Sequence, residues 1–306
     1  MLTRKSKLFL IKIFSLFSVV RGYNIPVVVL AQYLSSIFIL SPEKRALDVI
    51  LDWRLFLLVF ASTLAIASGY IINNFYDSEK DLINRPNKTR LDRLVSQKTK
   101  LQVYFLLNFL ATILALIISF RAALFFATYI FLIWFYSHKL KKYPIIGNLT
   151  ASLLAVLPFF GILLYYKNFY EVIFFHATFL FLLLLVREMI KDLENIKGDL
   201  ANNYQTIPIV HGELVSKKII TVLLLLTIIP VYYLINIFDV GYMDIYFYIG
   251  FMIMIFFGIQ LWKSETREQF VQLHNILKFL IVAGVFCIIL INPSILWHGK
   301  KLLQAI

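Results

Sequence analysis

Cysteine and charge are both scarce in this chain. Its 306 residues include one cysteine, Cys287, and only 15% are charged. A single cysteine inside an apolar run excludes a disulfide framework and a thiolate metal cluster. A soluble domain has roughly 25% charged residues, and 60% of this chain is hydrophobic. The composition therefore excludes an ordinary soluble protein.

Linker-like segments are missing as well. No stretch rich in Pro, Gly or Ser divides the chain, and apolar runs recur from Ile25 to Ile291. We therefore expect residues 1–306 to form one integral membrane domain. The formal net charge is +13, but the basic residues lie in short segments between apolar runs. Orientation in the bilayer explains such segments, so nucleic acid is not expected as a partner.

Nine segments are long and apolar enough, or nearly so, to cross a bilayer core of about 30 Å as helices. They are Ile25–Leu40, Arg54–Ile72, Leu101–Phe120, Ala122–Tyr136, Ile145–Tyr166, Val172–Ile190, Ile219–Ile237, Tyr242–Trp262 and Ile276–Ile291. The fourth is short, and the tight turn at Arg121 predicts a helical hairpin with the third, so eight spans are the alternative. We predict an all-α polytopic membrane protein with about nine transmembrane helices in one bundle.

The first 23 residues superficially resemble a signal peptide, because basic residues precede an apolar run. Lys12 interrupts that run, and no small-residue cleavage site follows it. Apolar residues recur instead at helical spacing: Leu8, Ile11, Phe14, Leu16 and Phe17. This pattern predicts an amphipathic helix that lies along the membrane surface before the first span.

Lys and Arg concentrate in alternate segments between the predicted spans. The rich segments are the N-terminus and residues 80–100, 139–142, 187–218 and 263–278. The intervening segments hold fewer basic residues, which are Lys44, Arg45 and Arg54, then Arg121, then Lys167, and finally Lys300 and Lys301 after the last span. Short cytoplasmic loops carry such an excess. The alternation predicts an odd number of spans, a cytoplasmic N-terminus and cytoplasmic loops in the rich segments.

The first of two unusual polar segments closes the second predicted span. In it, Asn73, Asp77 and Asp81 recur every fourth residue. If the helix continues past Ile72, these three oxygen-bearing side chains share one face. The segment falls on the predicted cytoplasmic side.

The second polar segment extends the sixth predicted span on the same side. Asp192, Asn195 and Asp199 have the spacing i, i+3, i+7, and Glu188 precedes Asp192 by one helical turn. Glu194 should point away from this face unless the helix unwinds.

The two segments together favour a cation site. Carboxylates on one face repel each other unless cations intervene, and Mg²⁺ takes oxygen ligands together with waters and substrate phosphates. Basic side chains nearby could contact a diphosphate: Arg85, Lys88, Lys141 and Lys191. A single charge run is usually a solvated loop, but two clusters with matching helical spacing predict a Mg²⁺–diphosphate held between two helices.

The paired clusters resemble the signatures of the UbiA-type intramembrane prenyltransferases. Their N-D-x-x-D-x-x-x-D signature reads here Asn73-Asn74-x-x-Asp77-x-x-x-Asp81, and D-x-x-D-x-x-x-D reads Asp192-x-x-Asn195-x-x-x-Asp199. Ile83-Asn84-Arg85-Pro86, Lys141-x-x-Pro144-x-x-Gly147-Asn148 and Thr206-Ile207-Pro208 also fit. The likeness covers nearly the whole chain.

The resemblance implies Mg²⁺-dependent transfer of a prenyl group from a prenyl diphosphate to a lipophilic acceptor, among the lipids of a bacterial or archaeal cell membrane. It implies metal-binding and catalytic roles for Asp77, Asp81, Asp192 and Asp199, with Asn73 as a supporting ligand. The implied substrate-binding residues are Asn73, Asn74, Arg85, Lys88, Lys141, Lys191 and Asn195, together with Arg21 and Asn24 of a family-like Arg-x-x-Asn segment. His138 and His211 are expected at the membrane interface.

Two residues depart from the family pattern. Asn74 and Asn195 stand where the family commonly has Asp, so each cluster lacks one negative charge. Amide oxygens still bind Mg²⁺, although more weakly than carboxylates. Because four aspartates and both helical spacings remain, an active enzyme is favoured over a damaged one.

The second segment also suggests an acceptor. With Thr206-Ile207-Pro208 after it, the stretch from Arg187 to Asp199 looks most like the geranylgeranylglycerol-phosphate geranylgeranyltransferase branch. Geranylgeranylglycerol phosphate is therefore the predicted acceptor. The alternatives are an aromatic quinone precursor and a catalytically silent lipid-binding relative. A transporter is disfavoured, because ionisable residues avoid the middle of the spans.

Overall fold

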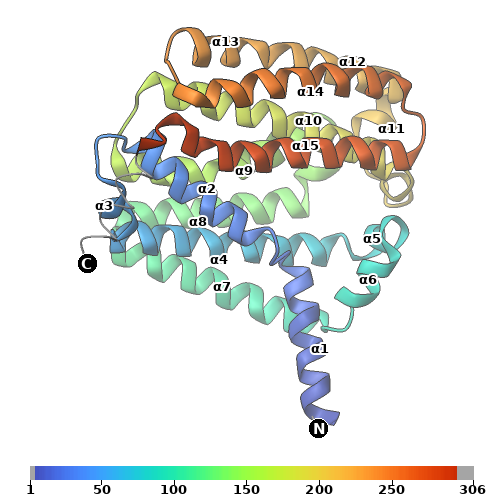
Figure 1. Ribbon diagram of the computed structural model, residues 1–306. Helices are drawn as coiled ribbons and strands as arrows, with labels where there is room; N and C mark the ends of the chain where they lie inside the picture. Colours follow the sequence, from blue (N-terminus) through green and yellow to red (C-terminus); the bar gives the residue numbers. More distant parts are fainter. Residues whose placement is uncertain (1–3, 295–306) are drawn as a thin grey trace.

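The computed structural model describes the backbone of residues 4–294 and the side chains of residues 10–294. Within these residues the chain forms helices and no strands, and the long helices run roughly side by side (Figure 1). The long ones are α4 (Trp53–Tyr76), α7 (Gln97–Ile118), α8 (Phe120–His138), α9 (Ile146–Tyr166), α10 (Glu171–Ala201), α12 (Glu213–Leu226), α14 (Asp244–Lys263) and α15 (Arg267–Cys287). The all-α prediction is confirmed.

Shorter helices complete the bundle. They are α1 (Arg4–Val19), α2 (Ile25–Ser35), α3 (Ala46–Ile50), α5 (Ser78–Asn84), α6 (Pro86–Asp92), α11 (Ile207–His211) and α13 (Ile228–Asn236), with the π-helical turn η1 (Ser36–Leu40) and the 3-10 turns η2 (Leu140–Lys142), η3 (Gly241–Met243) and η4 (Ile288–Ile291). The side chain of Leu8, and Lys300 and Lys301, which entered the sequence predictions, lie outside the described residues.

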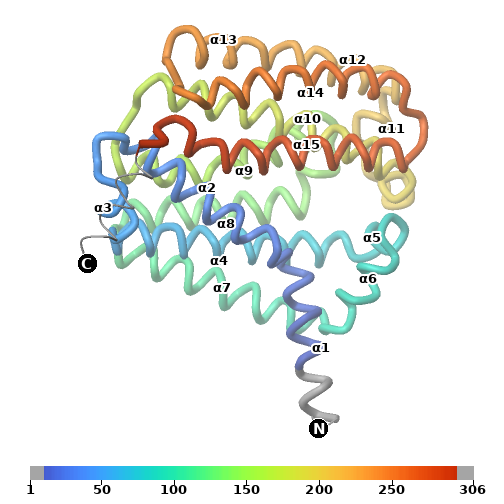
Figure 2. The backbone as a smooth tube through the Cα atoms, viewed as in Figure 1, coloured from blue at the N-terminus to red at the C-terminus, as the bar shows by residue number. Residues whose placement is uncertain are grey.

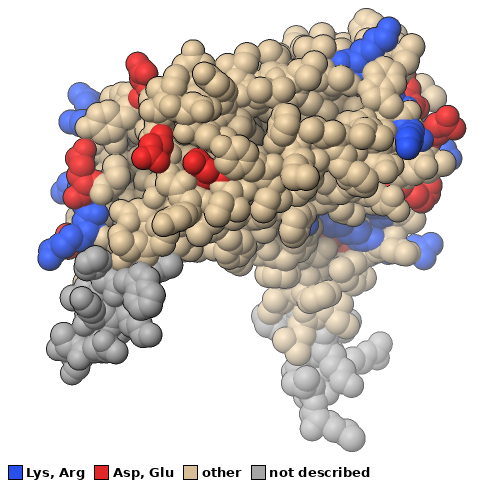
Figure 3. Space-filling model, turned by 45° about the horizontal axis from the view of Figure 1, so that its top comes forward, with Lys and Arg blue, Asp and Glu red and all other residues tan. Residues whose placement is uncertain are grey.

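Eight stretches of the described chain are helical, long and apolar enough to cross a membrane. They correspond to the second to ninth predicted spans. The first predicted span, Ile25–Leu40, is helical as α2 and η1 but shorter than the others. Large apolar side chains are exposed along the bundle, among them Phe109 on α7 and Met252 on α14. Figure 3 shows the charged side chains of one face gathered mostly toward the two ends, as a membrane-spanning bundle requires.

Side-chain caps start several of these helices. Asp52 accepts hydrogen bonds from the backbone amides of Arg54 and Leu55 at the start of α4. The Ser119 hydroxyl accepts one from Ala122 at the start of α8. Because α7 ends at Ile118, the hairpin predicted at Arg121 turns slightly earlier, at Ser119. Such caps satisfy amides that have no partner within the helix.

The predicted span Ile219–Ile237 is not one continuous helix. It is divided at Thr227 into α12 and α13. Pro230 lies in the first turn of α13, and its ring cannot approach the carbonyl group four residues earlier, on Leu226. The proline therefore accounts for the interruption, which the hydropathy pattern does not reveal.

One end of the bundle gathers the polar segments. Helix α10 has 31 residues, a length of about 46 Å at 1.5 Å per residue, so it exceeds a bilayer core of about 30 Å. Its last turns lie at the same end as α5 and α11, on the right in Figure 1. The chain returns to this end between α4 and α7, between α8 and α9, between α10 and α12, and between α14 and α15 (Figure 2).

Candidate active site

A polar cavity at this end is lined from both acidic segments. It encloses about 680 Å³, including space open to solvent. The sequence-predicted residues in its lining are Arg21, Asn73, Asp77, Asp81, Arg85, Lys141, Lys191, Asp192 and Asn195. Asn24, Asn74, Lys88 and Asp199 were predicted for the same site and do not line the cavity.

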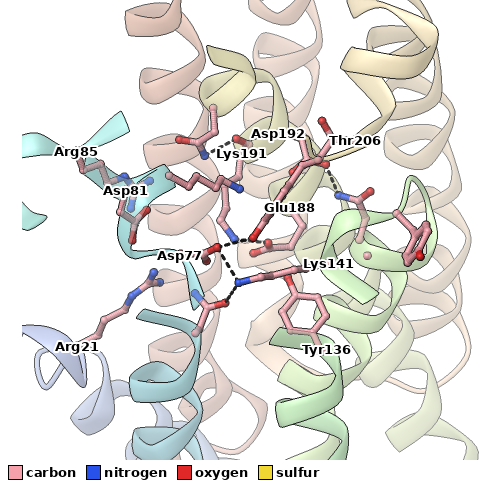
Figure 4. Close-up of a pocket in the computed structure, with 17 residues that line it drawn as sticks. Arg21, Asp77, Asp81, Arg85, Tyr136, Lys141, Glu188, Lys191, Asp192 and Thr206 are labelled. Carbon is pink, nitrogen blue, oxygen red and sulfur yellow. Dashed lines mark hydrogen bonds and ion pairs between the residues drawn. The ribbon is translucent and has the colours of Figure 1, made fainter. Parts of the chain in front are cut away.

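In the first acidic segment, Asp77 is a buried acid that is bonded to Lys141 and Tyr204. Helix α4 ends at Tyr76, but the amide of Asp77 still bonds to the Asn73 carbonyl, and the amide of Asp81 bonds to the Asp77 carbonyl at 2.8 Å. The helical spacing therefore continues, and the three side chains face one cavity. The Asp77 Oδ1 atom accepts hydrogen bonds from Lys141 Nζ at 2.7 Å and from the Tyr204 hydroxyl at 3.0 Å (Figure 4).

The two acids of this segment have opposite pKa shifts. Burial alone would raise the pKa of Asp77, but Lys141 and Lys80, with hydrogen bonds from Lys141 and Tyr204, outweigh it and lower that pKa to about 2. Burial raises the pKa of Asp81, and the adjacent Asp77 carboxylate adds to this effect. Asp77 is thus held as an anion, whereas Asp81 lacks a comparable partner.

Gly147 positions Lys141. The η2 turn carries Lys141 and packs against the start of α9, where a Cβ atom on residue 147 would lie 3.2 Å from the Lys141 Cα and carbonyl oxygen. A side chain at residue 147 would force the turn to move by a few tenths of an ångström, so glycine favours this close approach. The turn thereby directs the Lys141 ammonium to Asp77 and, at 3.4 Å, to the Asn73 side-chain oxygen.

Helix α10 supplies the opposite wall of the cavity. Lys191 Nζ donates to Glu188 Oε2 at 2.7 Å, and Asn148 of α9 donates to Asp192 Oδ2 at 2.7 Å. The Asn195 amide donates to the Lys191 carbonyl within the same helix. Acids, amides and a lysine of this segment therefore face the acids of the first segment across one space (Figure 4).

Lys80 connects the two acidic segments, and the sequence predictions did not include it. It lies on α5, lines the cavity and forms an ion pair with Asp199 of α10, whose side chain is fully buried. Lys80 follows Asp77 by three residues, so the same helical spacing that grouped the acids could have identified it.

Asn74 faces away from the cavity into a separate buried network. Its side-chain amide donates to Asp92 at 3.0 Å, and its oxygen accepts from Lys100 at 2.8 Å. Lys88 also donates to Asp92, at 2.6 Å, and Ser18 of α1 does so at 2.8 Å. In the structure, Asn74 and Lys88 therefore join α4, α6, α7 and α1 instead of lining the site.

The remaining candidates also lie outside the cavity lining. Asn24 precedes α2 and forms no side-chain cap. The His138 ring stacks on Trp134 with the centroids 5.3 Å apart, and His211 is exposed at the end of α11. Glu194 points away from the cavity, as the sequence predicted, and accepts hydrogen bonds from Arg85 and from His274 of α15.

Several cavity residues were not predicted as ligands. Tyr136, Asn148, Tyr204 and Thr206 line it. The Asn148 Oδ1 and Thr206 Oγ1 atoms are buried and have no hydrogen-bond partner among the described residues. Buried polar atoms normally have partners. These two atoms therefore mark where a polar ligand would bind.

The residues present fit a Mg²⁺ ion bound together with a diphosphate. No three His, Cys, Asp or Glu side chains in the described part of the chain are arranged to hold a metal by themselves. Mg²⁺ is usually bound by one or two carboxylates while substrate phosphates and waters fill its shell. Asp77, Asp81 and Asp192, from opposite walls, supply such carboxylates.

An apolar cavity lies farther along the bundle. It encloses about 850 Å³, including open space, and its walls come from α2, α9, α10 and α15. On α10 it begins at Leu183, nine residues from Asp192 and therefore about 13 Å away along the helix. A charged site and an apolar compartment thus follow each other along one helix.

Comparison with known proteins identifies the family. The model of the UbiA prenyltransferase family matches residues 29–280. This chain belongs to that family. Among named UbiA relatives, the digeranylgeranylglyceryl phosphate synthase of Thermococcus sibiricus is 36% identical over 181 residues, which cover 59% of this chain and 61% of that protein. The same-named protein of Pyrococcus horikoshii is 32% identical over 176 residues, covering 57% and 63%. The chain thus spans about 60% of the length of these relatives.

Solved UbiA structures share the fold. The structure of a digeranylgeranylglyceryl phosphate synthase superposes with a TM-score of 0.67 at 22% identity and covers 91% of this chain and 97% of that one. A UbiA homologue from Archaeoglobus fulgidus bound to GPP and Mg²⁺ gives 0.64 at 15% identity, covering 90% and 99%. The chain is therefore an integral, multi-pass membrane protein of the UbiA fold.

Proposed function

We propose that this chain transfers a prenyl group from a prenyl diphosphate to a lipophilic acceptor in the membrane, in a Mg²⁺-dependent reaction. The observation that carries the proposal is the shared cavity in which Asp77 and Asp81 face Asp192 among basic side chains. Membership of the UbiA prenyltransferase family supports the same reaction, as does the binding of GPP and Mg²⁺ by the A. fulgidus homologue.

The chain's own groups suit each part of the donor. Arg21, Arg85, Lys141 and Lys191 would bind diphosphate oxygens, and the prenyl chain would extend from the polar cavity toward the apolar one. Mg²⁺, when bound, adds positive charge that stabilises the leaving diphosphate. The bond between C1 and the diphosphate oxygen breaks, and the diphosphate keeps the electron pair. The acceptor oxygen bonds to C1, and its proton passes to the released diphosphate or to water. Preorganised cations at the leaving group favour this cleavage.

The acceptor that we propose is geranylgeranylglycerol phosphate. The named relatives from Thermococcus and Pyrococcus are digeranylgeranylglyceryl phosphate synthases, and the basic residues at the cavity would also suit an acceptor phosphate. We further propose that residues 1–306 act as one prenyltransferase unit. The cavity end would face the cytoplasm of a bacterial or archaeal cell, since the Lys- and Arg-rich segments lie at that end.

Product formation tests the reaction and the acceptor together. The purified full chain is incubated with radiolabelled geranylgeranyl diphosphate, Mg²⁺ and either geranylgeranylglycerol phosphate or 1,4-dihydroxy-2-naphthoate, with EDTA as control. We expect EDTA-sensitive product with the glycerol ether. Product with the naphthoate alone would replace the proposed acceptor. No product with either acceptor or with shorter donors would favour a catalytically silent lipid-binding relative.

Substitutions at the facing acids test the site. We expect Asp77→Ala and Asp192→Ala to reduce turnover by at least about a hundredfold, the effect of removing a group that stabilises transition-state charge. Both should insert into membranes at normal levels, because these residues lie outside the lipid-facing parts of the helices. If both variants are expressed at the wild-type level and keep full activity, Asp77 and Asp192 do not belong to the active site.

A further inference from the structure

Lys278 is a charged side chain within a membrane-spanning helix. It lies between the apolar residues Leu277 and Phe279 on α15, in a stretch long and apolar enough to cross a membrane. The side chain is exposed, and no acid of the described chain pairs with it. A charge at membrane depth is costly and usually has a functional partner. An anion that neutralises Lys278 therefore has to come from outside the described residues.

An aromatic ring orients the Lys278 ammonium. Its Nζ atom lies 5.3 Å from the centroid of the Tyr23 ring, and Tyr23 is 54% exposed in the turn between α1 and α2. A cation–π contact holds an ammonium group while its N–H groups stay free to donate hydrogen bonds. Tyr23 thus keeps Lys278 in a position to bind an anion.

The turn that carries Tyr23 lies near a membrane surface. The stretch Ile25–Leu40 after it is apolar but shorter than the other spans, and a span needs roughly 20 residues. The turn therefore lies close to the edge of the hydrocarbon core. Helix α1 leaves the bundle from this turn, across the direction of the long helices (Figure 1). A lysine side chain at this depth reaches the lipid headgroups.

The contact between Tyr23 and Lys278 also borders both cavities. Helices α2 and α15 line the apolar cavity through Ala31 and Ile281, among others. Ile281 follows Lys278 by three residues and so lies on the same side of α15. Arg21, in the same turn as Tyr23, lines the polar cavity. A ligand bound to Lys278 would therefore lie next to the site of the proposed reaction.

A phosphate carried by a lipid fits this position. Phosphate oxygens accept charge-assisted hydrogen bonds from an ammonium group, and the exposed Phe279 ring beside the lysine suits an apolar chain. Free phosphate would gain nothing from this apolar neighbour. Because the polar cavity takes the donor diphosphate in the proposed reaction, the acceptor phosphate is the better match for Lys278.

We propose that Lys278, oriented by Tyr23, binds the phosphate of the lipid acceptor at the membrane surface beside the two cavities. This inference rests on the proposed function. The bound phosphate keeps the acceptor next to the polar cavity, where its hydroxyl group reacts. Neither cavity lining includes Lys278 or Tyr23, so this site is additional to both.

Lipid binding without donor or metal tests the site. The full chain in detergent with EDTA is titrated with oleoyl lysophosphatidic acid, a single-chain glycerol phosphate lipid, or with monooleoylglycerol, which lacks only the phosphate. We expect Lys278→Met to weaken binding of the phosphate lipid about fivefold, the effect of one lysine near an anionic headgroup. Binding of monooleoylglycerol should stay within about twofold. An unchanged affinity for the phosphate lipid, or an equal loss for both lipids, would overturn the proposal.

Matched variants separate charge from packing. Lys278→Arg keeps the charge and should bind the phosphate lipid as the wild type does, and so should Lys263→Met, which removes an exposed lysine at the same end of the bundle. Tyr23→Phe should keep this affinity and Tyr23→Leu should lower it, because the ring face holds the ammonium. Displacement of the lipid by an equal concentration of inorganic phosphate would overturn the assignment to a lipid.

Steady-state rates distinguish this site from the reaction itself. Lys278→Met should raise the KM for geranylgeranylglycerol phosphate about fivefold, while kcat and the KM for geranylgeranyl diphosphate change less than about twofold. A rise in the donor KM alone would overturn the assignment to the acceptor. If the wild type binds the phosphate lipid through Lys278 but forms no product, the proposed function is wrong and the binding site stands.

Discussion

Asp77 and Lys141 form a buried ion pair at the centre of the site. The Asp77 side chain is 10% exposed and that of Lys141 5%, and Lys141 Nζ lies 2.7 Å from Asp77 Oδ1. Taking two charges out of water is costly, and the mutual attraction offsets that cost only while both partners are present. Burial alone would raise the pKa of Asp77, and Lys141 is the largest of the contributions that lower it and keep the carboxylate ionised.

Removing Lys141 should leave Asp77 unpaired. We expect Lys141→Met to lower the free energy of unfolding by about 3–5 kcal/mol, the usual cost of breaking a buried pair, and to reduce turnover at least tenfold. Added Mg²⁺ should raise its melting temperature more than that of the wild type, because the ion replaces the missing charge. Thermal denaturation in detergent measures both effects. Lys139→Met, at an exposed lysine two residues away, is the control, and equal losses in both variants would contradict this role.

The two asparagines that depart from the family pattern have different surroundings. Asn195 lines the cavity, whereas Asn74 contacts Asp92 and Lys100 outside it. Adjacent helical residues differ by about 100° in direction, and this rotation separates Asn74 from Asn73. The sequence signature includes both Asn73 and Asn74, but only Asn73 lines the cavity.

Restoring an aspartate should therefore matter at one position only. We expect Asn195→Asp to lower the Mg²⁺ concentration for half-maximal activity roughly three- to tenfold, because one added charge near a cation contributes about 1 kcal/mol or more. Asn74→Asp should leave that concentration within about twofold, since its carboxylate would face Lys100. Mg²⁺ titration of initial rates distinguishes them. An equal shift in both variants would show that position 74 reaches the metal.

At the level of elements, Glu194 fastens α5 and α6 to the bundle. Its carboxylate accepts a hydrogen bond from Arg85 at 2.9 Å and one from His274 of α15 at 3.0 Å, and Arg267 donates to the Asn84 carbonyl. Gly198 brings α10 close to Asn84, where a Cβ atom would overlap the asparagine side chain. These contacts hold Arg85 at the edge of the cavity.

Weakening this attachment should impair diphosphate binding more than chemistry. We expect Glu194→Gln to raise the KM for the prenyl diphosphate about threefold or more while kcat changes less, because Arg85 loses its charged partner but the reacting groups stay in place. Steady-state kinetics separates the two constants. Glu79→Gln removes an exposed partner of Arg93 and should change neither, since surface ion pairs contribute about 0–1 kcal/mol. A loss of kcat alone in Glu194→Gln would contradict the positioning role.

Hydropathy and helical spacing predict the elements better than the contacts between them. The spans from Arg54 onward and the shared face of Asn73, Asp77 and Asp81 follow from local periodicity. The break at Thr227 and the pairing of Lys80 with Asp199 do not, because they depend on a proline ring and on a partner more than a hundred residues away. Tertiary contacts of this kind leave no periodic signal in one sequence.

For the whole molecule, helix α10 unites the two compartments. Its charged turns line the polar cavity and its apolar turns line the second cavity, while the lipid-facing surfaces of the bundle stay apolar. A donor with a charged head and an apolar tail matches this order along the membrane normal. The polar end would therefore lie at one membrane surface, and the orientation that we propose from the distribution of Lys and Arg places it at the cytoplasmic one.

Thiol labelling tests the proposed orientation. In a Cys287→Ser background, we expect Lys142→Cys, at the cavity end, to react with a membrane-impermeant maleimide only after intact cells are opened. Arg45→Cys, at the opposite end, should react before the cells are opened. The loops richest in Lys and Arg stay on the cytoplasmic side, and they lie at the cavity end, so the loop of Arg45 is expected outside. Both positions are exposed, so burial does not limit the reaction, and the Cys287→Ser background alone measures unspecific labelling. Reaction of Lys142→Cys in intact cells while Arg45→Cys is protected would reverse the topology and place diphosphate release outside the cell.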